Sequence, residues 1–223
     1  MLAFSKKMGS HMKRIDRAET PAEKIAKGEF ILVIAERIAR DTGLDGLSMN
    51  ALSAACNVAK GTLYLYFKTR HEILAALFVK SLGDWIARFE RTLTHTMSYD
   101  EFCQTYAATL IQDDLILPLM HAAHDQFDAG LPDETYQEMM ESFQQMLDRQ
   151  AQIFCDALNI DSETASRAVW AFYTAALGAG HFGAVERKRA ALSSDIVHFR
   201  DALRFETMFL NVVSKLNLSG HSR

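Results

Sequence analysis

The chain has 223 residues, nearly half of them hydrophobic, with only three prolines and eleven glycines. This length suffices for one large domain, or for a small domain joined to a larger one, with a sizeable core. Scarce prolines and long stretches without turn signals favour helices throughout. Cys56, Cys103 and Cys155 are too few and too widely spaced for a disulfide framework or a metal site, which favours a reducing, cytoplasmic compartment. No apolar run approaches the roughly 20 residues that a membrane-spanning helix requires.

The net charge of −4 hides an asymmetry along the chain. Residues 1–71 hold 12 basic and 7 acidic residues, a net charge of +5, whereas residues 72–223 hold 12 basic and 21 acidic residues, a net charge of −9. A basic segment joined to an acidic body is expected of a protein that binds nucleic acid, although chance clustering predicts the same split. Residues 1–19 are expected to form a flexible basic arm.

A first helix is predicted from about Thr20 to Asp41. Threonine caps a helix, proline suits its first position and glutamate completes a capping box, so Thr20, Pro21 and Glu23 make a strong start. Gly43 follows where a C-terminal glycine cap is expected.

The pattern of the next residues indicates a helix, a tight turn and a second helix. Ser48 caps a short helix to about Ala55, Asn57 tolerates the left-handed backbone of a tight turn, and a further helix covers residues 60–67. No acidic residue occurs within residues 46–71. Because DNA repels carboxylates and attracts lysine and arginine, this segment is predicted to bind DNA.

The rest of the chain is predicted to be helical, with no convincing strand. Thr69 and Glu72 form another capping box, which opens a long helix toward Leu93. Five further helices are placed at about 98–112, 118–129, 133–158, 161–185 and 194–216, started by Ser98, Pro118, Asp133, Asp161 (or Ser162) and Ser194. We therefore expect an all-α protein of about nine helices. A three-helix helix-turn-helix DNA-binding domain is placed at 20–70, a larger helical domain at 71–217 and a tail at 218–223.

The segment from Ala55 to Leu74 resembles the signature of the tetracycline-repressor (TetR) family of transcriptional regulators. Its run A-C-N-V-A-K-G-T-L-Y-L-Y-F, followed by K-T-R-H-E-I-L, is similar to the family pattern A-G-V-S-K-G-T-L-Y-x-Y-F-x-S-K-E-x-L. The resemblance covers about residues 27–78. Asn57 replaces the usual turn glycine, Ala59 replaces the serine that caps the second helix, and Arg70 replaces a common lysine.

The resemblance implies that the second helix enters the major groove of DNA. Lys60 and Thr62 are then expected to face base edges or adjacent phosphates, and Gly61 lets its amide approach a phosphate closely. The expected DNA-binding set is completed by the hydroxyls of Ser48, Tyr64 and Tyr66 and by the charges of Lys68 and Arg70.

The resemblance also implies that the later helices dimerise and enclose a small-molecule effector. Small residues let two helix backbones approach closely, and a four-helix dimer interface is expected from Ala175, Gly178, Ala179, Phe182, Phe199, Leu203 and Met208. An effector pocket is expected among Phe102, Tyr106, His124, Phe127, Phe143, Met146, Trp170 and Tyr173. Packing inside a single subunit is the alternative for both sets.

These features predict a cytoplasmic, homodimeric repressor that a small-molecule effector releases from a palindromic DNA operator, with no cofactor, metal or membrane association. The alternative from another class is an all-helical enzyme or carrier, but the sequence has no Gly-rich phosphate loop, nucleophile elbow or paired metal motif. His121 and His124 have a spacing that metal sites use, and polar surface or pocket groups are the simpler interpretation. Sequence-independent DNA binding is the second alternative.

Overall fold

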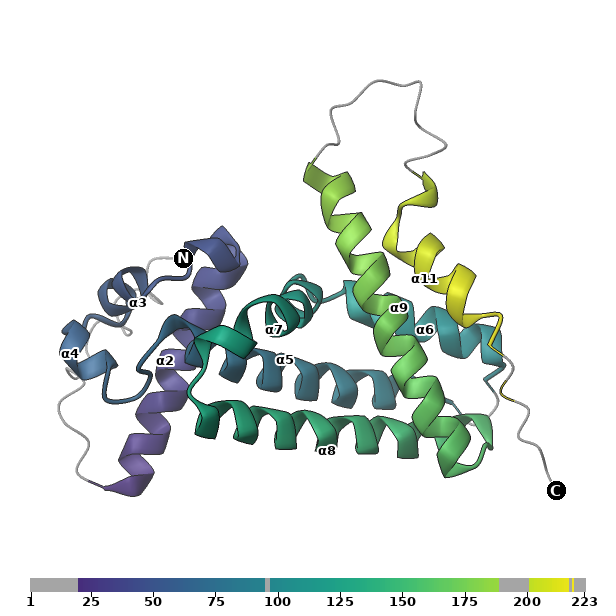
Figure 1. The fold of residues 1–223 in the computed structure, drawn as a ribbon, viewed down its shortest axis with the longest axis horizontal. Helices are drawn as coiled ribbons and strands as arrows, with labels where there is room; N and C mark the ends of the chain where they lie inside the picture. The colour runs from purple at the N-terminus through teal and green to yellow at the C-terminus, as the bar shows by residue number, and fades with distance from the viewer. Residues whose placement is uncertain (1–19, 95–96, 189–200, 217, 219–223) are drawn as a thin grey trace, which may run out of the picture. The chain divides into compact units, whose positions relative to one another are not determined.

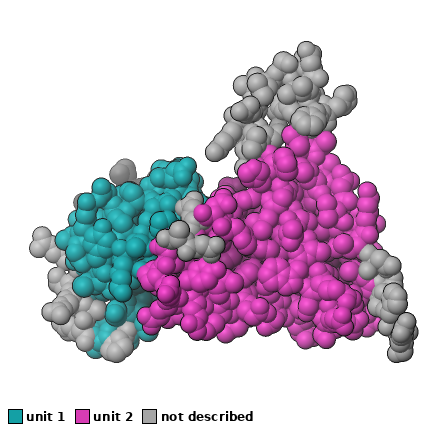
Figure 2. Space-filling view, viewed as in Figure 1, with its two compact units in different colours: residues 1–74 teal, residues 75–223 magenta. Residues whose placement is uncertain are grey.

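A computed structural model describes residues 20–94, 97–188, 201–216 and 218 (Figure 1). Within these ranges the regular structure consists of nine α-helices and one short 3-10 helix, with no strand, so the expected all-α fold is confirmed. The chain divides into two compact units, residues 1–74 and 75–223 (Figure 2). The division lies inside helix α5, whereas the sequence placed a boundary at 70–71. In the described part of the chain, no helix has the length and apolarity needed to cross a membrane.

Unit 1 is built around a helix-turn-helix. It contains α2 (Pro21–Thr42), the 3-10 helix η1 (Leu44–Gly46), α3 (Met49–Cys56), α4 (Lys60–Leu63) and the start of α5 (Arg70–Thr92). Helix α2 packs against η1 and α3, and α3 packs against α4. The fully or almost fully buried side chains include Ile31, Ala35, Leu47, Leu52 and Leu63.

The predicted ends of α2 are confirmed. The Thr20 hydroxyl accepts a hydrogen bond from the Glu23 backbone N–H at 3.2 Å, and the Glu23 carboxylate accepts one from the Thr20 backbone N–H at 2.9 Å. This pair is the capping box that the sequence predicted. At the other end Gly43 has φ +76°, a conformation that favours glycine because a Cβ would be strained there.

Helix α4 ends at Leu63, so it is shorter than the predicted helix over 60–67. The next residues form a tighter turn, in which the backbone N–H of Leu65 donates to the Thr62 carbonyl and that of Tyr66 donates to the Leu63 carbonyl. After this turn, the Lys68 N–H donates to the Glu72 carboxylate at 2.7 Å, at the start of α5.

Unit 2 is a helical body in which α9 (Ser162–Lys188) packs against α7 (Ile116–Gly130), α8 (Asp133–Leu158) and α11 (Phe205–Val213), as Figure 1 shows. Helix α6 (Tyr99–Ile111) packs against α7 and α11. Its core holds an inner aromatic cluster, whose rings come from α5, α6, α8, α9 and α11 and contact one another at centroid distances of 4.8–6.1 Å. Its members are Trp85, Phe89, Phe102, Tyr106, Phe154, Phe172 and Phe209.

Two predicted helix starts in unit 2 are confirmed by their side-chain caps. The Ser98 hydroxyl accepts from the Glu101 N–H, and the Glu101 carboxylate accepts from the Ser98 N–H, so α6 begins with a capping box. Asp161 accepts from the Thr164 N–H at 2.9 Å at the start of α9. The hydrogen bonds that Thr164 donates to the Asp161 carboxylate hold the pKa of this carboxyl below its usual value.

Other predicted helix starts are shifted. Helix α7 begins at Ile116, so Pro118 lies inside its first turn rather than at its first position. Pro132 occupies the N-cap of α8 without a side-chain cap, and Asp133 is its first helical residue. Ser194 lies outside the described residues, and the last described helix, α11, begins at Phe205 after a turn.

Candidate nucleic-acid interface

A left-handed residue and a buried serine make the turn between α3 and α4. Asn57 has φ +54° and ψ +45°, as its tolerance of this conformation predicted. The Ser53 hydroxyl donates to the Val58 carbonyl at 2.7 Å, and the Val58 N–H donates to the Ser53 carbonyl at 3.1 Å. The turn is thus closed from both directions. Ser53 was not singled out from the sequence, where its only signal is a hydroxyl at an otherwise apolar, buried position of α3.

The short helix α4 presents its first residues to solvent. Lys60 and Gly61 are exposed, Thr62 is half-buried and Leu63 is fully buried beneath them. A Cβ built on Gly61 would meet nothing within 4 Å, so its surroundings are open. Ala59 at the N-cap makes no side-chain cap, as the loss of the usual serine predicted. The backbone N–H groups at this end therefore gain no side-chain partner from the N-cap residue.

Ser48 and Lys68 also lie at exposed positions of unit 1. The Ser48 hydroxyl caps α3 by accepting from the Ala51 N–H at 3.1 Å. A hydroxyl that accepts one hydrogen bond still has its own proton to donate, so this cap remains compatible with a contact to a phosphate oxygen.

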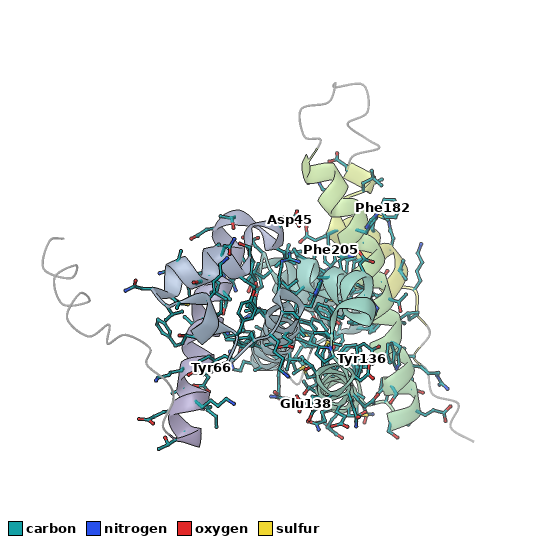
Figure 3. All side chains as sticks on the ribbon, turned by 60° about the vertical axis from the view of Figure 1, so that its left-hand side comes forward. Asp45, Tyr66, Tyr136, Glu138, Phe182 and Phe205 are labelled. Carbon is teal, nitrogen blue, oxygen red and sulfur yellow. The ribbon has the colours of Figure 1, made fainter. Side chains whose placement is uncertain are left out.

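The two tyrosines after α4 differ from each other. Tyr64 is 47% exposed. The Tyr66 ring lies against α2, where one of its carbons is 3.9 Å from a Cβ position at Gly28 (Figure 3). The Tyr66 hydroxyl oxygen is buried and has no hydrogen-bond partner among the described residues, and burial raises the pKa of Tyr66. The expectation that Tyr66 offers its hydroxyl to a phosphate therefore differs from the observed conformation, which turns that hydroxyl inward.

Arg70 also differs from its expected place. Its guanidinium is half-buried and donates to two backbone carbonyls, from Nε to Leu47 O at 2.7 Å and from Nη2 to Leu44 O at 2.8 Å. The sequence suggested a charge presented to the DNA backbone. The structure instead directs these donors to the connection between α2 and α3.

Seven of the eight residues expected to line an effector pocket fall into two groups in unit 2. Phe102 and Tyr106 belong to the inner aromatic cluster and are at most 1% exposed. Phe127, Phe143, Trp170 and Tyr173 belong to an outer aromatic cluster in which ring centroids lie 5.2–6.4 Å apart, and the His124 ring contacts that of Tyr173. Its members are Phe78, Phe127, Phe143, Trp170 and Tyr173. Met146 reaches toward Gly83 on α5.

Helices α7 and α9, which contribute Phe127 and Tyr173 to the outer cluster, also carry three histidines. His124 Nε2 and the Tyr173 hydroxyl are hydrogen-bonded at 2.9 Å. The His121 and His181 rings lie 5.8 Å apart, and His121 Nε2 is buried without a hydrogen-bond partner in the described part of the chain. Burial lowers the pKa of His121, the Asp125 carboxylate raises it, and the neighbouring His181 and His124 lower it further. Among the described residues, no three His, Cys, Asp or Glu side chains are grouped so that they could hold a metal ion.

An apolar groove runs along α9 and α11. It is lined by Trp170, Ala171, Thr174, Ala175, Gly178, Ala179, Phe182, Met208 and Val212. Trp170, Phe182 and Val212 are each about half exposed (Phe182 is labelled in Figure 3). Five of the seven residues expected at a dimer interface line this groove. Leu203 lies outside the groove, and Phe199 lies outside the described residues.

Comparison with known proteins points to one family. Residues 31–77 match the model of bacterial regulatory proteins of the tetR family. Over 73 residues the chain is 34% identical to an "Uncharacterized HTH-type transcriptional regulator" of Haemophilus influenzae, covering 33% of this chain and 39% of that protein. Over 71 residues it is 32% identical to the "Fatty acid metabolism regulator protein" of Bacillus subtilis, covering 32% of this chain and 37% of that one. These matches span less than two fifths of either relative.

The fold extends the likeness to most of the chain. The multidrug binding protein EbrR, solved with imidazole, has a TM-score of 0.52 at 16% identity and covers 79% of this chain and 92% of its own. TetR from Acinetobacter baumannii has a TM-score of 0.52 at 15% identity and covers 83% of this chain and 92% of its own. At such identities the likeness concerns the fold alone. The likeness in sequence to the tetR family of bacterial regulatory proteins thus lies in the helix-turn-helix region, and the likeness in fold extends over most of the chain.

Proposed function

We propose that this protein is a homodimeric, sequence-specific DNA-binding repressor, which a small-molecule effector releases from a palindromic operator. The observation that carries the proposal is the surface of α4. There Lys60 and the unobstructed Gly61 face solvent at the turn of a helix-turn-helix. No carboxylate occurs within residues 46–71 to repel phosphates.

In this proposal α4 enters the major groove, and each exposed group has a distinct partner. Lys60 and Thr62 face base edges or the adjacent phosphates, and the Gly61 amide approaches a phosphate that a Cβ would keep away. Ser48, Tyr64 and Lys68 contact the DNA backbone and set the register of the helix on the duplex. Tyr66 contributes packing against α2, since its hydroxyl is turned inward.

The apolar groove on α9 and α11 is proposed as the dimer interface. A second copy would cover Trp170, Phe182 and Val212, whose apolar surface is otherwise exposed to water. Gly178 is exposed and its Cβ position is open, so a partner helix can approach the backbone there. A two-fold dimer presents two α4 helices to half-sites that lie about 34–36 Å apart or a multiple of that distance.

The outer aromatic cluster is proposed as the place where the effector acts. Its rings supply an apolar surface, and the His124–Tyr173 pair supplies a polar group beside it, the combination that small-molecule sites use. One relative is a fatty acid metabolism regulator and one structural neighbour is a multidrug binding protein, and both support a largely apolar effector. An effector that favours one body conformation by about 1–3 kcal/mol would lower DNA affinity by the corresponding factor.

The experiment that tests the proposal is selection of DNA from a random-sequence pool by the full-length protein. A repressor of this kind enriches a two-fold symmetric motif whose half-sites are about one or two helical turns apart. A sequence-independent binder retains the pool without enriching a motif, and its affinity depends steeply on salt for every sequence. An enzyme or carrier without DNA affinity retains no DNA from the pool. A cytoplasmic location follows from the proposal, because the operator is there.

A further inference from the structure

The Arg70 guanidinium joins two elements that are distant in the sequence. Arg70 is the first residue of α5, and its two carbonyl acceptors, on Leu44 and Leu47, lie 26 and 23 residues earlier. Leu44 O also accepts from the Leu47 N–H at 3.1 Å, so the same carbonyl closes η1 and receives the guanidinium. Both hydrogen bonds are charge-assisted and partly buried, which makes them stronger than bonds between neutral groups.

The two donors belong to one rigid, planar fork. Nε–H and one Nη2–H of a guanidinium point in nearly the same direction, so they hold two acceptors at a set separation. A lysine has one terminal nitrogen on a flexible stem and does not hold both carbonyls in this way. The arginine at this position therefore fixes the geometry of η1 more tightly than a lysine would.

The segment that Arg70 holds leads directly into α3. The Leu47 side chain is fully buried, and the next residue is Ser48, the N-cap of α3 with φ −130°. The Ser48 carbonyl accepts from the Leu52 N–H at 2.9 Å, so any displacement of Leu47 moves the start of α3. We propose that Arg70 is a positioning residue for DNA binding, which acts through Ser48 rather than by touching a phosphate. This inference rests on the proposed function.

The test compares Arg70→Lys and Arg70→Gln with Lys68→Gln on the DNA fragment that the protein selects, at several salt concentrations. A positioning role predicts that both Arg70 variants lose affinity, by about tenfold or more, because each breaks at least one of the two charge-assisted hydrogen bonds. It also predicts an unchanged slope of log affinity against log salt. Lys68→Gln, which removes a proposed phosphate contact, lowers the magnitude of that slope by about 0.9. Ser48→Ala combined with Arg70→Lys loses no more affinity than the weaker-binding single variant.

Hydrogen exchange of the free full-length protein is the second measurement. Arg70→Lys is expected to speed exchange of the amides of Leu47, Ala51 and Leu52 relative to wild type. Wild-type affinity in Arg70→Lys, with a reduced salt slope in Arg70→Gln, would make Arg70 a phosphate contact and overturn the inference. Unchanged exchange at these amides would also overturn it. If the wild type selects no DNA sequence, the proposed function fails. The inference about Arg70 is still tested in that case, because hydrogen exchange needs no DNA.

Discussion

Removal of one hydroxyl group, in Tyr66→Phe, is expected to stabilise the protein without weakening DNA binding. The Tyr66 hydroxyl oxygen is buried and has no partner among the described residues. An unsatisfied buried polar group costs about 1–3 kcal/mol of folding free energy. Since the ring as a whole is only half-buried, we take the lower end, about 1 kcal/mol. For a chain of this size that corresponds to a rise in Tm of about 2–4 °C.

Thermal unfolding followed by circular dichroism measures this change, and Tyr64→Phe is the matched control. Tyr64 is 47% exposed, so loss of its hydroxyl is expected to leave stability within about 0.5 kcal/mol of wild type. Its DNA affinity is expected to fall, because a proposed phosphate contact is lost. A lower Tm for Tyr66→Phe would refute the reasoning about stability. A DNA affinity that falls in Tyr66→Phe and stays constant in Tyr64→Phe would show that the assignment of the two tyrosines is reversed.

Three further changes are expected to have effects of known direction. Gly46→Ala places a Cβ 2.0 Å from Thr42 Oγ1 and 2.5 Å from Thr42 Cβ. Urea unfolding should therefore show a free energy of unfolding lower by about 1–3 kcal/mol. Wild-type stability in this variant would count against the packing described for η1. Phe182→Arg puts a charge in the apolar groove and should shift sedimentation from dimer to monomer, whereas an intact dimer would place the interface elsewhere. His121 has a pKa below its unfolded value of about 6.5, so only the unfolded state gains a proton as pH falls through that value. Stability should therefore decline below about pH 6.5 in wild type and decline less in His121→Gln, and identical pH profiles would contradict this assignment.

Features that depend on neighbouring residues were predictable from the sequence. The capping boxes at Thr20 and Ser98 use residues only three positions apart, and the left-handed turn at Asn57 depends on that residue's own backbone preference. The exposure of Lys60 and Gly61 follows similarly from their place at the start of α4. These features locate the helix-turn-helix and the surface that we propose for DNA.

Features that depend on distant backbone groups were not predictable. Arg70 finds carbonyl acceptors 23 and 26 residues away, and every residue except proline offers the same carbonyl and amide, so no sequence pattern marks these acceptors. The Tyr66 ring likewise lies beside Gly28 of α2, which is distant in the sequence.

In unit 2, too, some features were predictable from the sequence and others were not. The sequence identified its aromatic residues, but an aromatic residue at helical spacing is equally suited to a core and to a pocket. Only packing separates Phe102 and Tyr106, in the inner aromatic cluster, from Phe143 and Tyr173 in the outer one. Trp170, expected in the pocket, contacts the outer cluster and also lines the groove proposed for the dimer.

The most direct measurement is a titration of the full-length protein against its selected DNA fragment and a scrambled fragment, with Lys60→Ala and Lys215→Ala alongside. Both variants remove one exposed positive charge, but Lys215 lies in unit 2, away from α4 in the sequence. The account predicts that wild type and Lys215→Ala prefer the selected fragment by at least about a thousandfold, and that Lys60→Ala loses much of this preference. Equal affinity for both fragments, or a loss of the same size in the two variants, would contradict sequence recognition by α4.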